Sequence, residues 1–381
     1  MRVEELKQYQ QALIGYYTSG NVLKIRLHGK TVYRYAAGVS EIQSQTAMHG
    51  DEFFHIYSCT KIATVVAGLQ LIERGLCKLD DPLYSYIPEF AELHVQSPAG
   101  EITPVKRPVY IRDLFTMTAG FSYELDTPGI QRAREITKGR MDTVETIRCM
   151  ASDPLQFQPG EVWNYSLCHD ILGGLISLIS GKKLREYVKE NIFDPLDMCH
   201  SFFHHTPETE SHMALQYRFV PADSDQNINE GSFEDVGKKN SLVLGEEYDS
   251  GGAGIISTLS DYTKLLSALS NYGMGETGAR ILSQSSVEHL RTPQLTAAQM
   301  KTYDWRILKG HGYGLGVQTH IDPKESGLAW NIGAFGWPGA AGAMAIVDPK
   351  IGLAAFYLQH TMSVRNEECI MGLINKIYQC L

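Results

Sequence analysis

Residues 55–66 read HIYSCTKIATVV, and this stretch holds the strongest indication of both fold and chemistry. Ser58 and Lys61 are three residues apart in it, so on a helix their side chains share one face. A serine hydroxyl attacks an acyl carbon only after a nearby base has taken its proton, and a lysine amine serves as that base if burial lowers its pKa. The pair therefore predicts an acyl-transfer centre with Ser58 as the nucleophile.

The surroundings of Ser58 distinguish it from the other Ser-x-x-Lys match in the chain, Ser180 to Lys183. Ser180 ends an apolar helical run at a glycine and two lysines, as at an ordinary helix C-terminus. Ser58 follows the strand-like residues 53–57 and precedes the apolar run 62–72, which predicts a helix that begins near Ser58. The alternative is a helix-capping serine beside a solvated lysine, but a lysine in the first turn opposes the helix dipole.

Composition places the chain among ordinary globular proteins. Its 381 residues are 43% hydrophobic and 20% charged, which suits roughly two domains with sizeable cores. A net charge of −9 without a basic run argues against nucleic acid or an anionic membrane as a partner. Seven scattered cysteines, a charged beginning and no long apolar stretch predict a cytoplasmic protein with reduced thiols and no structural zinc.

Strand-like segments lie toward both ends of the chain, and helical segments fill the middle. Strands are predicted at 22–27, 31–36, 312–320, 341–347 and 352–358. Helices are predicted at 2–18, 61–74, 111–117, 144–152, 169–180, 184–192, 260–270 and 365–378. Residues 207–249 are polar, acidic and weakly periodic, so they are predicted to form a long excursion.

This order of segments predicts an α/β (α+β) fold in which helices flank an antiparallel sheet of about five strands, built from both chain ends. We assign residues 1–60 and 255–381 to the sheet domain. Residues 61–254 are assigned to a mostly helical domain that includes the excursion, with the candidate active site between the two domains.

Five motifs, in order, resemble the serine β-lactamase and penicillin-binding-protein superfamily, especially its class C β-lactamase and family VIII carboxylesterase branch. They are Ser58-x-x-Lys61, GLCKLDDP at 75–82, IRDLFTMTAG at 111–120, PG leading to YS at 159–166, and SGGAG at 250–254. The resemblance covers most of the chain and implies a β-lactamase/transpeptidase-like fold without a cofactor. It also implies that Tyr165 is the tyrosine of the second catalytic motif and shares proton transfer with Lys61.

The chain departs from the family pattern at two positions that bind substrate. The second motif usually reads Tyr-x-Asn, but Leu167 stands where the asparagine would contact an amide side chain of a β-lactam. The third motif usually reads Lys-Thr-Gly or His-x-Gly, and its best local equivalent is Trp337-Pro338-Gly339-Ala340, just before the predicted strand at 341. A rival, Lys350-Ile351-Gly352, falls in a predicted turn, where a lysine is usually solvated.

By the same resemblance, the backbone amides of Ser58 and Ala340 would form the oxyanion hole, and Trp337, Gly339 and Leu167 would line the substrate site. A tryptophan in the third motif removes the charge-assisted contact that holds a β-lactam or D-alanyl carboxylate. It offers an apolar wall instead. The substrate is therefore expected to be an uncharged ester or amide.

Two further motifs are weaker. The segment CHSFFHH at 199–205 has histidines at a chelating spacing, but a preceding Asp-Pro break and the lack of a second ligand group argue against a metal site. The glycines at 251, 252 and 254 lack the Gly-Lys-Ser/Thr of a phosphate loop, so they predict close backbone packing.

We therefore predict a serine hydrolase that acts through an acyl-enzyme on small neutral esters or lactones. A β-lactamase or D-amino-acid peptidase is the first alternative, since Arg218, Lys238 or Lys239 from the excursion would restore carboxylate binding. A non-catalytic scaffold is the lesser alternative, and the presence of all three catalytic candidates argues against it. The order of proton transfer between Lys61 and Tyr165, and the oligomeric state, stay open.

Overall fold

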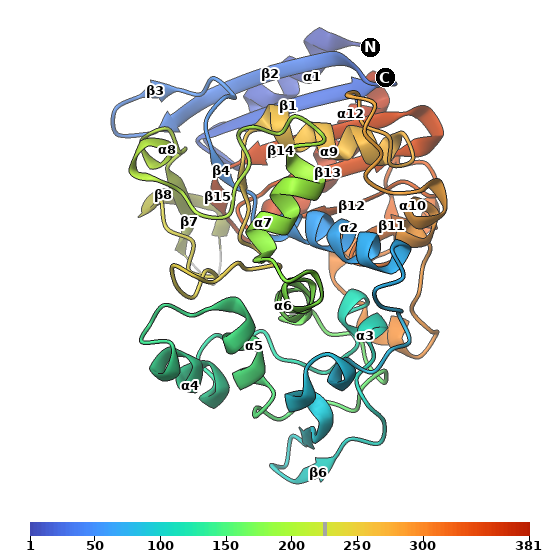
Figure 1. The fold of residues 1–381 in the computed structure, drawn as a ribbon. Coiled ribbons are helices and arrows are strands. Elements are labelled where there is room, and N and C mark those ends of the chain that lie inside the picture. The colour runs from blue at the N-terminus through green and yellow to red at the C-terminus, as the bar shows by residue number, and fades with distance from the viewer. Residues whose placement is uncertain (224–226) are drawn as a thin grey trace.

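An eight-stranded antiparallel sheet forms the upper part of the molecule, and both ends of the chain contribute strands to it (Figure 1). In the computed structural model, which describes residues 1–223 and 227–381, the strand order is β10-β11-β12-β13-β14-β1-β2-β3. These strands are β1 (Gly20–Leu27), β2 (Lys30–Glu41), β3 (Thr46–Ala47), β10 (His311–Tyr313), β11 (Gln318–His320), β12 (Phe335–Pro338), β13 (Met344–Asp348) and β14 (Leu353–Gln359). The predicted α/β fold is confirmed, and the sheet is larger than predicted because β3, β10 and β11 are only two or three residues long.

The middle of the sheet is buried on both faces. All seven residues of β14 are buried, which explains its nearly continuous apolar sequence, and Val22 of β1 pairs with Leu358. The turn between β1 and β2 has positive φ at His28 and Gly29, as the right-handed twist of a two-residue hairpin requires.

Helices cover both faces of the sheet. Helices α1 (Val3–Ala12) and α12 (Asn366–Cys380) lie on the face that carries Tyr33 and Tyr357, where Tyr33 donates to Gln10. Helix α9 (Leu259–Ser270) lies on the opposite face, where Lys24 donates to Ser260. The predicted helix over 2–18 is too long, because α1 ends before Gly15, which has positive φ.

The lower part of the molecule is helical and packs around α6 (Figure 1). Helix α2 (Thr60–Glu73) joins this part to the sheet and is buried from Thr60 to Leu71, so its sequence is apolar on every side. The other helices are α3 (Ile111–Phe115), α4 (Pro128–Ile136), α5 (Thr143–Met150), α6 (Cys168–Ser180), α7 (Leu184–Val188), α8 (Pro207–Ser211), α10 (Gln284–Arg291) and α11 (Pro323–Ser326). Short strands β5 (His94–Gln96) and β6 (Ile102–Pro104) pair with each other, as do β4 (Phe54–His55) and β9 (Ile256–Ser257).

Two segments differ from the sequence predictions. The excursion at 207–249 contains helix α8 and a hairpin of β7 (Gln216–Asp223) and β8 (Asn227–Gly237), and β7 also pairs with β15 (Thr361–Met362). Residues 224–226 of that excursion lie outside the described residues. The single strand predicted over 312–320 is wrong, because Gly316 has positive φ and breaks it into β10 and β11.

The structure does not test the proposed division of the chain into two domains. The chain passes between the sheet and the helical part near β4 and β9, which lie at the predicted boundaries. Within the described residues, we find no helix that is both long and apolar enough to cross a lipid bilayer.

Candidate active site

Ser58 lies at the junction between β4 and α2, in the single 3-10 turn Tyr57–Cys59. The preceding residue, Tyr57, has a φ of 46°, a left-handed conformation that aromatic residues rarely adopt. Such strain typically costs about 1–3 kcal/mol and is concentrated at functional sites. The Tyr57 hydroxyl donates to the side chain of Gln216, which helps to hold this turn in place.

The three predicted catalytic side chains lie together. The Tyr165 hydroxyl donates to Ser58 Oγ at 2.6 Å, and Lys61 Nζ lies 3.5 Å from the same oxygen. Lys61 also donates to the backbone oxygen of Gly252 at 2.8 Å. Lys61 is completely buried and Ser58 is 7% exposed, so little solvent screens the charges here.

The charge of Lys61 differs from the sequence prediction. Burial acts to lower its pKa, but the oxygens of Tyr123 and Tyr165 and the carboxylate of Asp170 outweigh burial, and the pKa of Lys61 is raised. The prediction of a lowered pKa was wrong because it did not include Tyr123 and Asp170. Lys61 is therefore an ammonium ion at neutral pH.

Tyr123 is part of this site and was missed from the sequence. Its ring stacks on that of Tyr165 with centroids 5.3 Å apart and an interplanar angle of 14°. Lys61 Nζ lies 5.8 Å from the Tyr123 ring centroid and 4.5 Å from that of Tyr165. Burial raises the pKa of Tyr123 while the charge of Lys61 opposes that rise. The only sequence signal was its position three residues after the motif at 111–120.

The third motif packs directly against the turn that holds Ser58. A Cβ atom on Gly339 would lie 2.5 Å from the Ile56 carbonyl oxygen, so only glycine permits this approach. The Cys59 thiol donates to the Trp337 carbonyl at 3.4 Å. Trp337 and Pro338 end strand β12, and the next strand begins at Met344. The prediction that the motif precedes a strand beginning near 341 was therefore wrong, because the glycine and proline in β12 concealed this strand.

Ala340 follows this strand in a tight turn. The Gly342 amide donates to the Gly339 oxygen at 2.9 Å, and the side chain of Asn366 donates to the Ala340 oxygen at 3.2 Å. In the part of the chain that the structure describes, no group accepts a hydrogen bond from the Ala340 amide. That amide is thus available to a substrate oxygen.

The two residues predicted to replace family substrate contacts are placed differently. Trp337 is 1% exposed, stacks on Tyr165 at 5.7 Å and donates its indole N–H to the Tyr165 oxygen at 3.4 Å. Leu167 packs with Phe121 and Ile171 around a small pocket that neither Ser58 nor Tyr165 lines. Leu167 is therefore not brought to the nucleophile.

Trp305 supplies an aromatic surface that the sequence analysis also missed. It is 38% exposed, and its ring centroid lies 5.1 Å from that of Tyr165 and 5.5 Å from that of Trp163. It precedes a short 3-10 turn in a segment without hydrophobic periodicity, so no pattern indicated its position. An apolar group bound beside Tyr165 would meet this ring.

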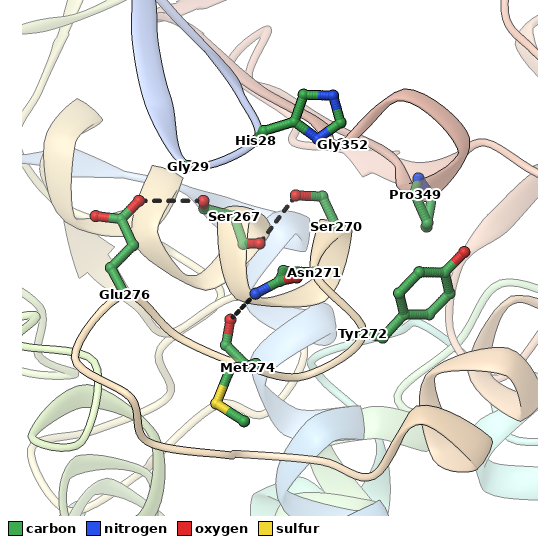
Figure 2. Close-up of a pocket in the computed structure, with 10 residues that line it drawn as sticks. All are labelled: His28, Gly29, Ser267, Ser270, Asn271, Tyr272, Met274, Glu276, Pro349 and Gly352. Carbon is green, nitrogen blue, oxygen red and sulfur yellow. Dashed lines mark hydrogen bonds between the residues drawn. The ribbon is translucent and has the colours of Figure 1, made fainter.

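The rival third motif lies at the other end of the sheet. Lys350 follows the end of β13, whereas Trp337 pairs with Ala345 near its start. Pro349 and Gly352 line a cavity of about 340 Å³ (Figure 2). Its two serine hydroxyls bond to Glu276 and to a backbone carbonyl, so this larger cavity contains no nucleophile paired with a base.

The cationic and histidine candidates lie elsewhere. Arg218 is exposed on β7, Lys239 is exposed, and Lys238 donates to the backbone oxygen of Glu210. His204 Nε2 lies 2.9 Å from Asp249, and the backbone amide of His200 donates to Asp261. Over residues 1–223 and 227–381 there is no group of three or more side chains placed to hold a metal ion.

A serine at the start of a helix, with a lysine one turn later and a tyrosine hydrogen-bonded to it, is an arrangement suited to acyl transfer. The chain belongs to the Beta-lactamase family, whose model matches residues 6–371. Its relatives in this family include esterases and acyltransferases, so the family is one of serine hydrolases and acyltransferases.

Individual relatives are similar over most of the chain. It is 29% identical to Protein Rv1367c of Mycobacterium tuberculosis, over 90% of this chain and 86% of that protein. It is 28% identical to esterase EstB of Burkholderia gladioli, over 93% of this chain and 88% of that esterase. Among solved structures, EstCE1, described as a hydrolase with promiscuous acyltransferase activity, matches with a TM-score of 0.79 at 21% identity, covering 98% of each chain. This last similarity confirms the β-lactamase/transpeptidase-like fold.

Proposed function

We propose that this protein hydrolyses small, uncharged carboxylic esters or lactones through an acyl-enzyme formed on Ser58. The observation that carries the proposal is the 2.6 Å hydrogen bond between Tyr165 and Ser58 Oγ, with the Lys61 ammonium 3.5 Å from the same oxygen. The similarity to esterase EstB supports the choice of reaction.

The first half of the reaction forms the bond between Ser58 Oγ and the acyl carbon. Because Lys61 is an ammonium ion, Tyr165 is the group that exchanges protons with Ser58 and with the leaving alcohol. Lys61 stabilises the negative charge that Tyr165 carries when it lacks its proton. The amides of Ser58 and Ala340 donate to the oxyanion, and such donors typically contribute about 3 kcal/mol each.

The second half releases the acyl group. A water molecule attacks the acyl carbon, Tyr165 accepts a proton from it, and Ser58 recovers its own proton as the carboxylic acid leaves. The substrate preference rests on the third motif, where Trp337 replaces the cation that would pair with a substrate carboxylate. The exposed ring of Trp305 favours an apolar acyl or alcohol group in its place.

The test is hydrolysis of a short-chain p-nitrophenyl ester and a chromogenic cephalosporin by the wild type, Ser58→Ala and Ser180→Ala. Ser180 is a matched control because it is the serine of the other Ser-x-x-Lys match and its hydroxyl bonds only within its own helix end. We expect ester turnover in the wild type and in Ser180→Ala, a loss of at least about 10³-fold in Ser58→Ala, and little cephalosporin cleavage.

The other outcomes separate the alternatives. Efficient cephalosporin cleavage by the wild type would favour a β-lactamase or D-amino-acid peptidase. Undiminished turnover in Ser58→Ala would contradict the assignment of the nucleophile. A wild type inactive on both substrates would favour the non-catalytic scaffold.

A further inference from the structure

We propose that Asp170 is a positioning residue for Lys61, and that its buried carboxylate keeps Lys61 charged and fixed between Ser58 and Tyr165. The inference deepens the proposed function and rests on it. Asp170 lies in the first turn of α6, five residues after Tyr165, and was not singled out from the sequence.

The Asp170 carboxylate is buried but well supplied with hydrogen bonds. It is 2% exposed, and Oδ1 accepts from Ser250 Oγ at 2.7 Å and from the Tyr248 hydroxyl at 3.1 Å. Burial raises the pKa of Asp170, while the charge of Lys61 and the hydrogen bonds from Ser250 and Tyr248 oppose that rise. A carboxylate that accepts several hydrogen bonds at a helix N-terminus is held in its charged form.

Asp170 and Lys61 meet on either side of Gly252. A Cβ atom on Gly252 would lie 2.5 Å from Asp170 Oδ2 and 3.3 Å from Lys61 Nζ, so only glycine leaves room for both. This places the two charges within the range of roughly 6 Å over which an opposite charge stabilises an ionised neighbour. The hydrogen bond from Lys61 to the Gly252 oxygen then fixes the position of the ammonium group.

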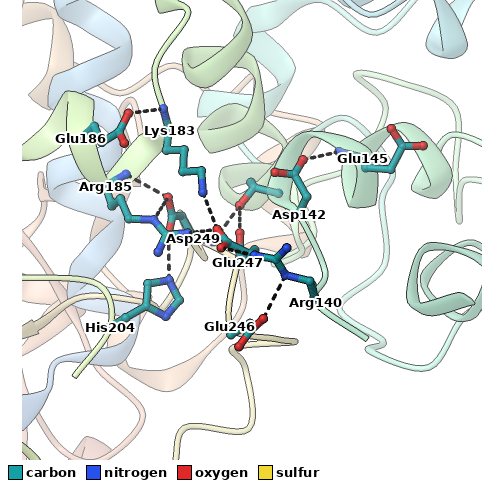
Figure 3. Close-up of polar contacts among 11 residues, drawn as sticks. Arg140, Asp142, Glu145, Lys183, Arg185, Glu186, His204, Glu246, Glu247 and Asp249 are labelled. Atoms are coloured by element: carbon teal, nitrogen blue, oxygen red, sulfur yellow. Dashed lines mark hydrogen bonds and ion pairs between the residues drawn. The ribbon is translucent and has the colours of Figure 1, made fainter. Parts of the chain in front are cut away.

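The segment Glu247–Gly252 holds this arrangement from outside. Tyr248 and Ser250 face inward to Asp170. The alternate residues face a cluster that we call the outer charged network (Figure 3). It consists of Arg140, Lys183, Arg185, His204, Glu246, Glu247 and Asp249. Asp249 pairs with Arg185 at 3.0 Å and with His204 at 2.9 Å, which anchors the segment just before Gly252.

Other titratable groups also face Lys61 and Asp170. Burial, and after it the charge of Lys61, lowers the pKa of His169 to about 3, and burial raises the pKa of Cys168 to about 12. Burial also raises the pKa of Tyr123 and of Tyr248. These four groups are therefore uncharged near neutral pH. Besides Tyr165, only the interaction between Lys61 and Asp170 links two charges in this set.

The test compares Asp170→Asn with the wild type over a range of pH. Removal of the carboxylate charge makes the Lys61 ammonium easier to deprotonate, so the alkaline limb of the kcat/KM profile should move to lower pH by about one unit or more. Asp249→Asn is the matched control, because Asp249 is also buried, at 1% exposed, but faces the outer charged network. We expect that control to leave the alkaline limb where it is.

An Asp170→Asn enzyme with an unshifted alkaline limb would overturn the proposal even if its turnover fell, since a purely structural role predicts that result. If Asp170→Asn does not fold, thermal unfolding of the double variant Lys61→Met/Asp170→Asn decides the question. Recovery of a folded protein supports the charge pair, because removal of both charges leaves none uncompensated, and failure to recover contradicts it. This second measurement needs no activity, so it separates failure of this inference from failure of the proposed function.

Discussion

Two charged regions lie on opposite sides of the segment Glu247–Gly252, and they differ in exposure to solvent. The inner pair, Lys61 and Asp170, is 0% and 2% exposed. In the outer charged network, the side chain of Glu247 is 21% exposed and that of Arg140 is 62% exposed. Charges in water are screened and contribute modestly to stability, whereas buried charges determine each other's protonation. The outer region has more charges, but only the inner pair is placed to influence chemistry.

The largest expected effect comes from breaking the inner pair. Lys61→Met removes the ammonium and leaves the Asp170 carboxylate buried without its opposite charge. We expect ester turnover to fall by about 10³-fold. We also expect stability to fall by roughly 3–5 kcal/mol, as when one partner of a buried pair is removed. Enzyme assays and urea unfolding measure the two effects, and a Lys61→Met protein as stable as the wild type would contradict the pairing with Asp170.

A smaller and more selective effect is expected at Tyr165. Tyr165→Phe removes the hydroxyl that donates to Ser58 but keeps the ring that stacks on Tyr123 and Trp337. Turnover should fall by about 10²-fold or more, because the proton-exchanging group is lost. Stability should change by only about 1 kcal/mol, the typical contribution of one hydrogen bond. Unchanged turnover would show that Tyr165 takes no part in proton transfer.

The sequence predicted the inner region only in part, for a physical reason. Ser58, Lys61 and Tyr165 stand in local motifs, and α2, α6 and α9 have clear periodicity, so these features were predicted to within one residue at helix ends. Tyr123 and Asp170 reach Lys61 only through the folded chain, from a loop and from another helix. Their effect reversed the direction of the Lys61 pKa that burial alone predicts. Strand β12 was missed because its glycine and proline break the strand pattern, although both fit its position beside Ser58.

The smallest expected effect lies in the outer charged network. Hydrogen bonding to Lys183, with the charges of Arg185 and Lys183, lowers the pKa of Glu247 to about 2. A lowered folded-state pKa stabilises the protein above the ordinary glutamate value of about 4.3, and this contribution is lost as pH falls toward about 2. Glu247→Gln should therefore cost at most about 1 kcal/mol at pH 7, because the pair is partly exposed.

Urea unfolding at pH 7 and near pH 2 checks this expectation, since the difference between Glu247→Gln and the wild type should shrink in acid. Ester turnover at pH 7 should not change. A drop in turnover comparable to that of Tyr165→Phe would show that the two regions are coupled more strongly than their exposure suggests.

The pairing of β1 with β14 has a consequence for how the chain folds during synthesis. Val22 must wait for Leu358 before the centre of the sheet can close. At translation rates of about 5–20 residues per second, that wait lasts roughly 20–60 s. Until then the β1–β2 hairpin presents an apolar edge that other chains can pair with. Nascent chains should therefore be most prone to aggregate late in translation, and chaperones that shield strand edges should increase the yield of folded protein.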